Sequence, residues 1–234
     1  AGPSVQITIP PGGSYDFSIG NFSAFPDHER IYGANGLSHG FEFDGKVYLP
    51  IDDNVTEPPR YVAVHSNHLF FACGSSIIHS ALGNPFNFEV VNGAGEIGTG
   101  GVITGLLQMT GNQGTAALAV FARNSTWVLY GTSAQDWKFV TLNVGIGAWD
   151  HTVQNLFDAF ALDDRGVTMM QQTLKYGNFD STTITHNIQR FIDLQRGKVT
   201  ASSLNRQNNQ YRAFFNDGYG LYCTSTPDGF AGNA

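Results

Sequence analysis

Residues 61–80 read YVAVHSNHLFFACGSSIIHS and contain three short apolar runs. The runs cover residues 61–64, 69–72 and 77–79, and they are rich in the β-branched and aromatic side chains that favour strands. The segments between the runs are polar and only a few residues long. This stretch therefore predicts consecutive antiparallel strands, with a hairpin that leads from residues 69–71 to residues 77–80.

Similar hairpins recur along the chain at a loose period. With Phe71, Phe121, Leu162 and Phe215 as landmarks, the spacings are 50, 41 and 53 residues. A four-stranded propeller blade takes roughly 40–50 residues. We therefore predict an all-β fold, a β-propeller of about four to five blades in which one blade is incomplete or completed by other sequence. A β-sandwich is the alternative, because irregular spacing also fits two stacked sheets.

The rest of the chain supports short strands joined by turns. The hairpin dipeptides are Asn35-Gly36, Asp44-Gly45, Asp217-Gly218 and Asp228-Gly229. Further strands are predicted over residues 117–121, 127–130, 160–162 and 211–215.

Two other segments complete the predicted organisation. Residues 186–196 follow the helical spacing and predict one short connecting helix. Residues 1–226 are expected to form a single propeller-like domain, and residues 227–234, which lack the strand pattern, a frayed or truncated tail.

The composition is typical of strands and turns, and the charge is uneven. Charged residues make up 13% of the chain, about half the usual share, while glycine is abundant. Residues 1–150 hold five Lys or Arg against twelve Asp or Glu, which accounts for the whole net charge of −7. An acidic first part argues against binding of phosphate groups, which requires clustered cations. No signal peptide and no membrane segment is predicted.

One motif matches the dinucleotide fingerprint letter for letter. Residues 93–98 read GAGEIG, but the glycine-rich residues 99–105 that follow make a poor helix. The fingerprint requires a helix whose N-terminus holds the pyrophosphate, and an acidic residue about 20 positions later, which is missing here. We interpret residues 93–98 as a glycine-rich loop between blades and assign no cofactor.

Histidines and cysteines give no clear site either. His65 and His68 flank a predicted turn without a local third metal ligand, and we interpret them as structural. Ser80, next to His79, lacks the glycine-flanked turn that a nucleophilic serine normally occupies. Cys73 and Cys223 each lie in an apolar run, so two buried free thiols are expected.

Paired carboxylates could serve a glycosidase, because some propellers use two acids on either side of a sugar. The adjacent pairs are Asp52-Asp53 and Asp163-Asp164. Neighbouring side chains in one loop are expected to point apart, and the arginines are scattered singly. We therefore assign no catalytic, cofactor-binding or metal-ligating residue and expect no enzyme activity.

Several hairpin segments together resemble the propeller proteins of tailed-phage tails, which include tail nozzle and tail tubular proteins. The similarity covers most of residues 15–226. It is carried by residues 30–36 (RIYGANG), 65–71 (HSNHLFF), 79–86 (HSALGNPF), 121–126 (FARNST) with 129–131, 162–167 (LDDRGV) and 210–218 (QYRAFFNDG).

The resemblance implies a structural ring subunit at the portal-distal end of a phage tail. The implied partners are other tail proteins (adaptor, fibre or hub subunits) and further copies of the chain. DNA would pass transiently without sticking, and the protein would be made in the bacterial cytoplasm and reside in the virion. A receptor- or glycan-binding propeller is the competing hypothesis, and it predicts clustered exposed aromatic residues.

Overall fold

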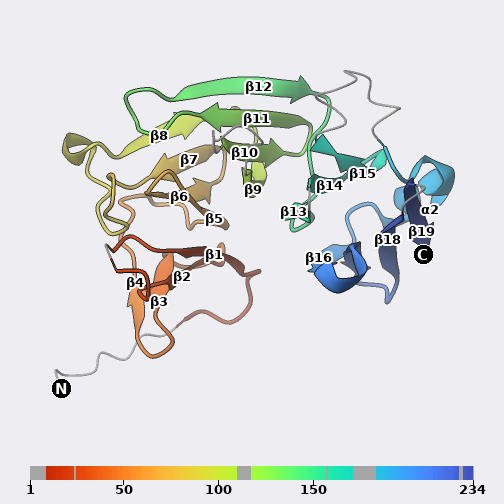
Figure 1. The fold of residues 1–234 in the computed structure, drawn as a ribbon, viewed down its shortest axis with the longest axis horizontal. Coiled ribbons are helices and arrows are strands. Elements are labelled where there is room, and N and C mark those ends of the chain that lie inside the picture. Colours follow the sequence, from red (N-terminus) through yellow and green to blue (C-terminus); the bar gives the residue numbers. More distant parts are fainter. Residues whose placement is uncertain are drawn as a thin grey trace. The chain divides into compact units, whose positions relative to one another are not determined.

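The computed structural model describes residues 9–23, 25–109, 117–156, 158–170, 183–226 and 229–233. These residues form five small antiparallel sheets and one short α-helix (Figure 1). In each sheet the strands are neighbours in the order in which they occur in the chain, as in the blades of a propeller. The predicted class, an all-β propeller with four to five blades and one short helix, is confirmed. The alternative, a two-sheet β-sandwich, is not confirmed.

The chain divides into two compact units, Ala1–Gly98 (unit 1) and Thr99–Ala234 (unit 2). The single propeller-like domain over residues 1–226 stays a prediction. In each sheet the strands pair with their neighbours in the chain.

The described residues of unit 1 form two four-stranded sheets and one 3₁₀ turn, η1 (Val90–Asn92). The strands are β1 (Asp16–Gly20), β2 (Arg30–Ala34), β3 (Phe41–Phe43) and β4 (Tyr48–Pro50), then β5 (Tyr61–His65), β6 (His68–Cys73), β7 (Ser76–His79) and β8 (Gly95–Gly98).

Unit 2 contains two four-stranded sheets and, in its described part, a three-stranded one between them in the sequence. The strands are β9 (Ile103–Met109), β10 (Ala117–Ala122), β11 (Ser125–Tyr130) and β12 (Lys138–Val144), then β13 (Gln154–Asn155), β14 (Ala159–Asp163) and β15 (Gly166–Met169), and finally β16 (Val199–Asn205), β17 (Gln210–Phe215), β18 (Gly220–Thr226) and β19 (Gly229–Asn233). The 3₁₀ turns η2 (His186–Ile188) and η3 (Arg206–Asn208) and the helix α2 (Gln189–Gln195) complete it.

The two sheets of unit 1 are joined through their first strands. Asp16 Oδ2 and Ser18 Oγ on β1 accept hydrogen bonds from the backbone N–H groups of Val62 (2.9 Å) and Val64 (3.1 Å) on β5. Gly20 permits the close approach, because a Cβ atom there would lie 2.7 Å from the Val64 side chain. The apolar core between the sheets consists of Tyr32, Ala34, Ile51, Val62, Leu69, Phe71, Cys73, Ile78 and Phe88.

In unit 2 the first strands of the sheets are likewise linked by side-chain hydrogen bonds. Gln154 Nε2 on β13 donates to Ser202 Oγ on β16 over 2.9 Å, and the buried Tyr211 hydroxyl donates to the Thr152 carbonyl over 2.8 Å. The largest core cluster consists of Trp149, Phe160, Leu162, Val167, Met169, Ile192, Tyr211, Ala213, Phe215, Leu221 and Cys223.

Most local predictions hold, and two require correction. The helix predicted over residues 186–196 is present as η2 followed by α2. The predicted tail is wrong for residues 229–233, which form β19 and pair with β18, while residues 227, 228 and 234 lie outside the described part. Glycines at 229 and 232 have a low strand propensity, so the sequence gives no local signal for this strand. Pairing with β18 stabilises it.

The second correction concerns residues 93–98, predicted as a loop between blades. Gly95–Gly98 form β8, the outermost strand of their sheet, paired with β7. Finally, no helix among the described residues combines the length and the apolar character needed to cross a membrane.

Candidate functional site

The turn between His65 and His68 is a structural element. His65 and His68 are paired across the turn from β5 to β6, and Ser66 and Asn67 between them have φ angles of 47° and 59°. Positive φ at both central residues is typical of a tight hairpin turn. Both imidazoles are buried, and the turn sits among the packed aromatic rings of its own sheet.

Both the carbonyl oxygen and the hydroxyl group of Ser80 form hydrogen bonds. Its carbonyl oxygen accepts from Nδ1 of His68 (2.7 Å) and from Nδ1 of His79 (3.1 Å), so each of these nitrogens carries the proton. Its hydroxyl accepts from the Leu69 N–H and donates to the Ala81 carbonyl. Burial lowers the pKa of His79. The arrangement holds the start of β6 against the end of β7 and offers no activated nucleophile.

The cysteines are buried free thiols, as predicted. Burial raises the pKa of both Cys73 and Cys223 to about 12. Because the thiolate is the reactive form, these side chains are chemically inert near neutral pH.

The glycine motif at residues 93–98 opens a strand instead of a helix. Gly93 has a φ of 88° and ends η1, and β8 begins two residues later. The pyrophosphate-binding geometry of a helix N-terminus is therefore absent at this described segment.

The carboxylates of Asp163 and Asp164 point to different partners, as the sequence predicted. Asp163 is buried, and its Oδ2 accepts from Nη2 of Arg165 at 2.8 Å. Burial raises the Asp163 pKa, while the Arg165 guanidinium opposes that rise. Arg165 also donates to the Gly145 carbonyl over 2.7 Å, so the pair ties the β14–β15 turn to the loop after β12.

Asp164 is the centre of a second set of contacts in unit 2. Its Oδ1 accepts from the Trp149 indole N–H and from Arg123 Nη2, both at 2.7 Å. Nε of Arg196 lies 3.6 Å from the same oxygen, and the Arg123 guanidinium stacks over the Trp149 ring at 5.3 Å. These contacts join the β10–β11 turn, the β14–β15 turn and the end of α2, which is a structural role.

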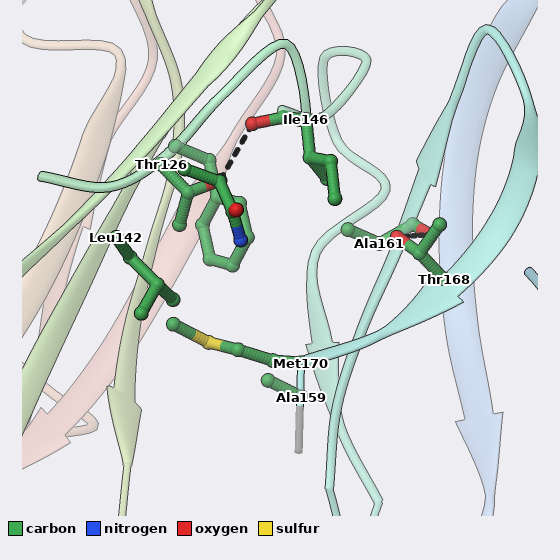
Figure 2. Close-up of a pocket in the computed structure, with 9 residues that line it drawn as sticks. Thr126, Leu142, Ile146, Ala159, Ala161, Thr168 and Met170 are labelled. Carbon is green, nitrogen blue, oxygen red and sulfur yellow. Dashed lines mark hydrogen bonds between the residues drawn. The ribbon is translucent and has the colours of Figure 1, made fainter. Parts of the chain in front are cut away.

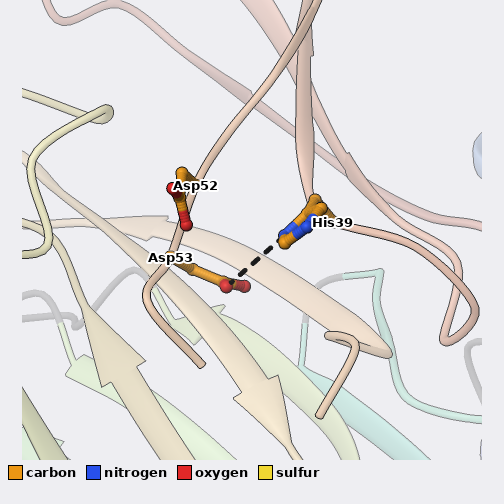
Figure 3. Close-up of side chains that lie close together, drawn as sticks. All are labelled: His39, Asp52 and Asp53. Carbon is orange, nitrogen blue, oxygen red and sulfur yellow. Dashed lines mark ion pairs between the residues drawn. The ribbon is translucent and has the colours of Figure 1, made fainter. Parts of the chain in front are cut away.

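Asp52 and Asp53 contradict the expectation that neighbouring carboxylates point apart. A carboxylate oxygen of each and a ring nitrogen of His39 all lie within 4.8 Å of one another (Figure 3). Retaining glycosidases hold two carboxyls about 5–5.5 Å apart with the sugar between them. Asp53 is almost fully buried, so no sugar can enter between these two acids. Sequence reasoning missed His39, because only the strand register brings it to this place.

The described pocket in unit 2 is small and mostly apolar (Figure 2). Its two threonine hydroxyls are engaged, because Thr126 donates to the Ile146 carbonyl and Thr168 to the Ala161 carbonyl. No residue that lines this pocket is titratable, so the pocket offers no side chain for acid–base catalysis. The lining residues are Phe121, Thr126, Leu142, Asn143, Ile146, Ala159, Ala161, Thr168 and Met170.

The acidic charge of the chain is concentrated in unit 1. Unit 1 holds three Lys or Arg against ten Asp or Glu, a formal charge of −7, whereas unit 2 holds nine of each. Seven of the ten acids are solvent-exposed: Asp27, Glu29, Asp44, Asp52, Glu57, Glu89 and Glu96. The sequence predicted the excess over residues 1–150, and the unit boundary confines it to the first 98 residues.

Unit 1 also carries an aromatic cluster that the sequence did not reveal. The Tyr15 and Phe17 rings stack at 5.9 Å, and both pack edge-on against Phe41, which stacks on Tyr48 at 4.6 Å. The Phe17 side chain remains 57% exposed. The cluster forms because β1 and β3 flank β2 in one sheet and direct these rings to the same side.

No family model and no curated protein matches the chain.

Proposed function

We propose that the protein is a structural subunit of a tailed-phage tail, a nozzle or tubular ring component that forms part of the DNA-ejection conduit. The observation that carries this proposal is the charge of unit 1, seven exposed carboxylates among three cations. A conduit for DNA has to let a polyanion slide without binding it, and clustered cations would retain it. At a Debye length of about 8 Å in physiological salt, carboxylates close to the path repel DNA appreciably.

The position of the family-like segments supports the same proposal. HSNHLFF spans the β5–β6 turn, FARNST the β10–β11 turn and LDDRGV the β14–β15 turn. FARNST and LDDRGV lie at the turn between the second and third strands of their sheets, and HSNHLFF lies at the turn between the first and second strands. Segments of three different sheets thus carry the resemblance.

A ring requires contacts between copies of the chain. Val90 and Val91 in η1 are 79% and 88% exposed, directly before the glycine-rich residues 93–98. Two adjacent exposed valines on a loop are suited to packing against a neighbouring subunit. We assign this loop to the contact between copies within the ring.

The test is quantitative mass spectrometry of phage particles purified by density from the source of this sequence. The expected result is a small, fixed number of copies per particle, calibrated against the major capsid protein. Particles that lack the protein, while it occurs free in the lysate, would overturn the proposal.

Charge reversal tests the conduit role separately. The variant Asp27→Lys, Glu29→Lys and Glu96→Lys should slow DNA ejection in vitro, most strongly at low salt. The matched control is Asp27→Glu, Glu29→Asp and Glu96→Asp, which changes the same positions and keeps the charge. Equal ejection rates for both variants would remove the electrostatic argument.

The aromatic cluster favours a second candidate, a receptor- or glycan-binding propeller. Exposed aromatic rings such as Phe17 and Tyr15 are suited to stacking on sugar faces. A glycan array distinguishes the two functions, because a conduit subunit should bind no sugar. Binding that is lost in the Phe17→Ala variant would favour the second candidate.

A further inference from the structure

The end of the β3–β4 hairpin brings three potential metal ligands together. Phe41 pairs with Pro50, and the Ile51 N–H donates to the Gly40 carbonyl over 2.7 Å, which extends the pairing by one residue. The next positions along this register are His39 and Asp52. Cross-strand neighbours lie about 4.5–5.5 Å apart at their Cβ atoms, so their side chains can meet.

Asp53 joins them because the chain bends directly after the hairpin. Asp52 Oδ1 accepts from the Asn54 N–H and Asp53 Oδ1 from the Val55 N–H, and Asn54 has a φ of 58°. Ile51 lies in the apolar core of unit 1 and Val55 packs against it. The loop is therefore anchored on both sides of the two carboxylates.

The Asp53 carboxylate has unusual surroundings. Its side chain is 1% exposed, and its Oδ2 has no hydrogen-bond partner. Nδ1 of His39 lies 3.8 Å from Asp53 Oδ1, too far for a hydrogen bond. No lysine or arginine of the described residues forms an ion pair with Asp53. A buried carboxylate with one oxygen unpaired is costly, and a bound cation reduces that cost.

Burial raises the pKa of Asp53, and the Val55 N–H and His39 partly oppose that rise. A cation beside the carboxylate would oppose it further, because it favours the ionised form. The carboxyl end of Asp53 faces the His39 ring, and the Asp52 side chain lies close to both (Figure 3).

We propose that His39, Asp52 and Asp53 form a binding site for a divalent transition-metal ion of the Zn²⁺ type. One imidazole nitrogen with two carboxylates is a ligand set for zinc-like ions, whereas Ca²⁺ and Mg²⁺ prefer oxygen alone. Three protein ligands leave a coordination position for water. The site is independent of the proposed tail function.

The geometry requires only a small closure. Ligands at about 2.1 Å from a tetrahedral ion are about 3.4 Å apart, and these atoms lie within 4.8 Å of one another. His39 and Asp52 are exposed and can turn inward, although Asp52 would have to adjust its hydrogen bond from the Asn54 N–H, while Asp53 stays in place. Bound metal would clamp the open end of the β3–β4 hairpin onto the anchored loop.

The test is isothermal titration of Zn²⁺ into the full chain after removal of metals with a chelator. We expect one ion per chain at this site, with affinity reduced at least about tenfold in both His39→Gln and Asp53→Asn. His28→Gln and Asp27→Asn are the matched controls, because both residues are exposed in the same unit. The affinity of these two variants for Zn²⁺ should equal that of the wild type. Excess Ca²⁺ should not displace the Zn²⁺.

A second measurement distinguishes a metal ligand from a residue that is merely structural. Without metal, Asp53→Asn should melt at the same temperature as the wild type or higher, because the buried charge is gone. With Zn²⁺, the wild type should melt higher than the variant, since ligand binding stabilises only the folded state.

Two results would overturn the proposal. The first is no stoichiometric Zn²⁺ binding, or binding that neither His39→Gln nor Asp53→Asn weakens. The second is an Asp53→Asn variant that is less stable than the wild type by the same amount with and without Zn²⁺. Displacement of Zn²⁺ by Ca²⁺ would overturn the assignment to a transition metal.

Discussion

Unit 1 carries ten acids against three Lys or Arg, whereas unit 2 carries nine of each. In unit 2 the opposite charges meet, and Asp163, Asp164 and Asp193 all pair with arginines across turns and helix ends. In unit 1, Arg30 lies 3.8 Å from Glu42, and His39 lies 3.8 Å from Asp53. In unit 2 several acids are thus paired with arginines, whereas in unit 1 acids outnumber Lys and Arg and most of them are exposed.

The difference teaches what each kind of charge does. The pairs of Asp164 with Arg123 and Arg196 join separate turns of unit 2, so their loss should lower the stability of the fold. Most acids of unit 1 are solvent-exposed and face molecules outside the fold. Changing them should alter interactions with the surroundings far more than stability.

The largest expected effect comes from removing a buried carboxylate in unit 2. Asp163→Ala should lower the free energy of unfolding by about 3 kcal/mol, because Arg165 loses its carboxylate partner in a mostly buried site. Chemical denaturation measures the change. Asp193→Ala is the control, since its ion pair with Arg196 is exposed and should be worth about 0.5 kcal/mol or less. Equal losses in both variants would contradict the distinction between buried and exposed pairs.

An intermediate effect is expected at Asp16, the acid of unit 1 that accepts the Val62 N–H. Burial raises its pKa to about 6, so the folded state favours the protonated form. Its contribution to stability is therefore complete at low pH, below the ordinary value of 3.8, and is lost as the pH rises through 6.

Asp16→Asn keeps an acceptor for Val62 and removes the ionisation. The variant should gain about 2 kcal/mol relative to the wild type at pH 7, and the gain should vanish near pH 4. Denaturation curves at several pH values measure it, with Asp27→Asn as the exposed control. A gain that is independent of pH would show that Asp16 titrates at its ordinary value.

The smallest effect is expected on the exposed acidic surface. Glu96→Gln should raise stability by about 0.3 kcal/mol at low salt, because it removes one negative charge from a unit with an excess of them. The gain should disappear at high ionic strength. Lys138→Gln in the neutral unit 2 is the comparison, and it should show no such gain at low salt.

Sequence reasoning succeeded where the signal is local. The strands and turns around residues 61–80 and Asp44-Gly45 follow from apolar runs and turn chemistry, and Asp44 Oδ1 indeed accepts from the Lys46 and Val47 N–H groups. It failed for β19, because pairing with β18 decides that strand and its glycines give no propensity signal. Pairing between strands is not a local property.

The same limit applies to the candidate sites. The acidic excess is visible in the sequence because it is a count. The grouping of His39 with Asp52 and Asp53 is not, because it depends on the register of a hairpin and on a bend after it. The aromatic cluster of Tyr15, Phe17 and Phe41 likewise needs three strands in one order.

The two buried thiols have a consequence for where the protein can function. Cys73 and Cys223 are held protonated and away from solvent, with pKa values of about 12. Oxidants react with exposed thiolates, so neither residue is a ready target for disulfide exchange or sulfenic acid formation. These two thiols should therefore stay reduced both in the reducing interior of a cell and in the oxidising medium outside it.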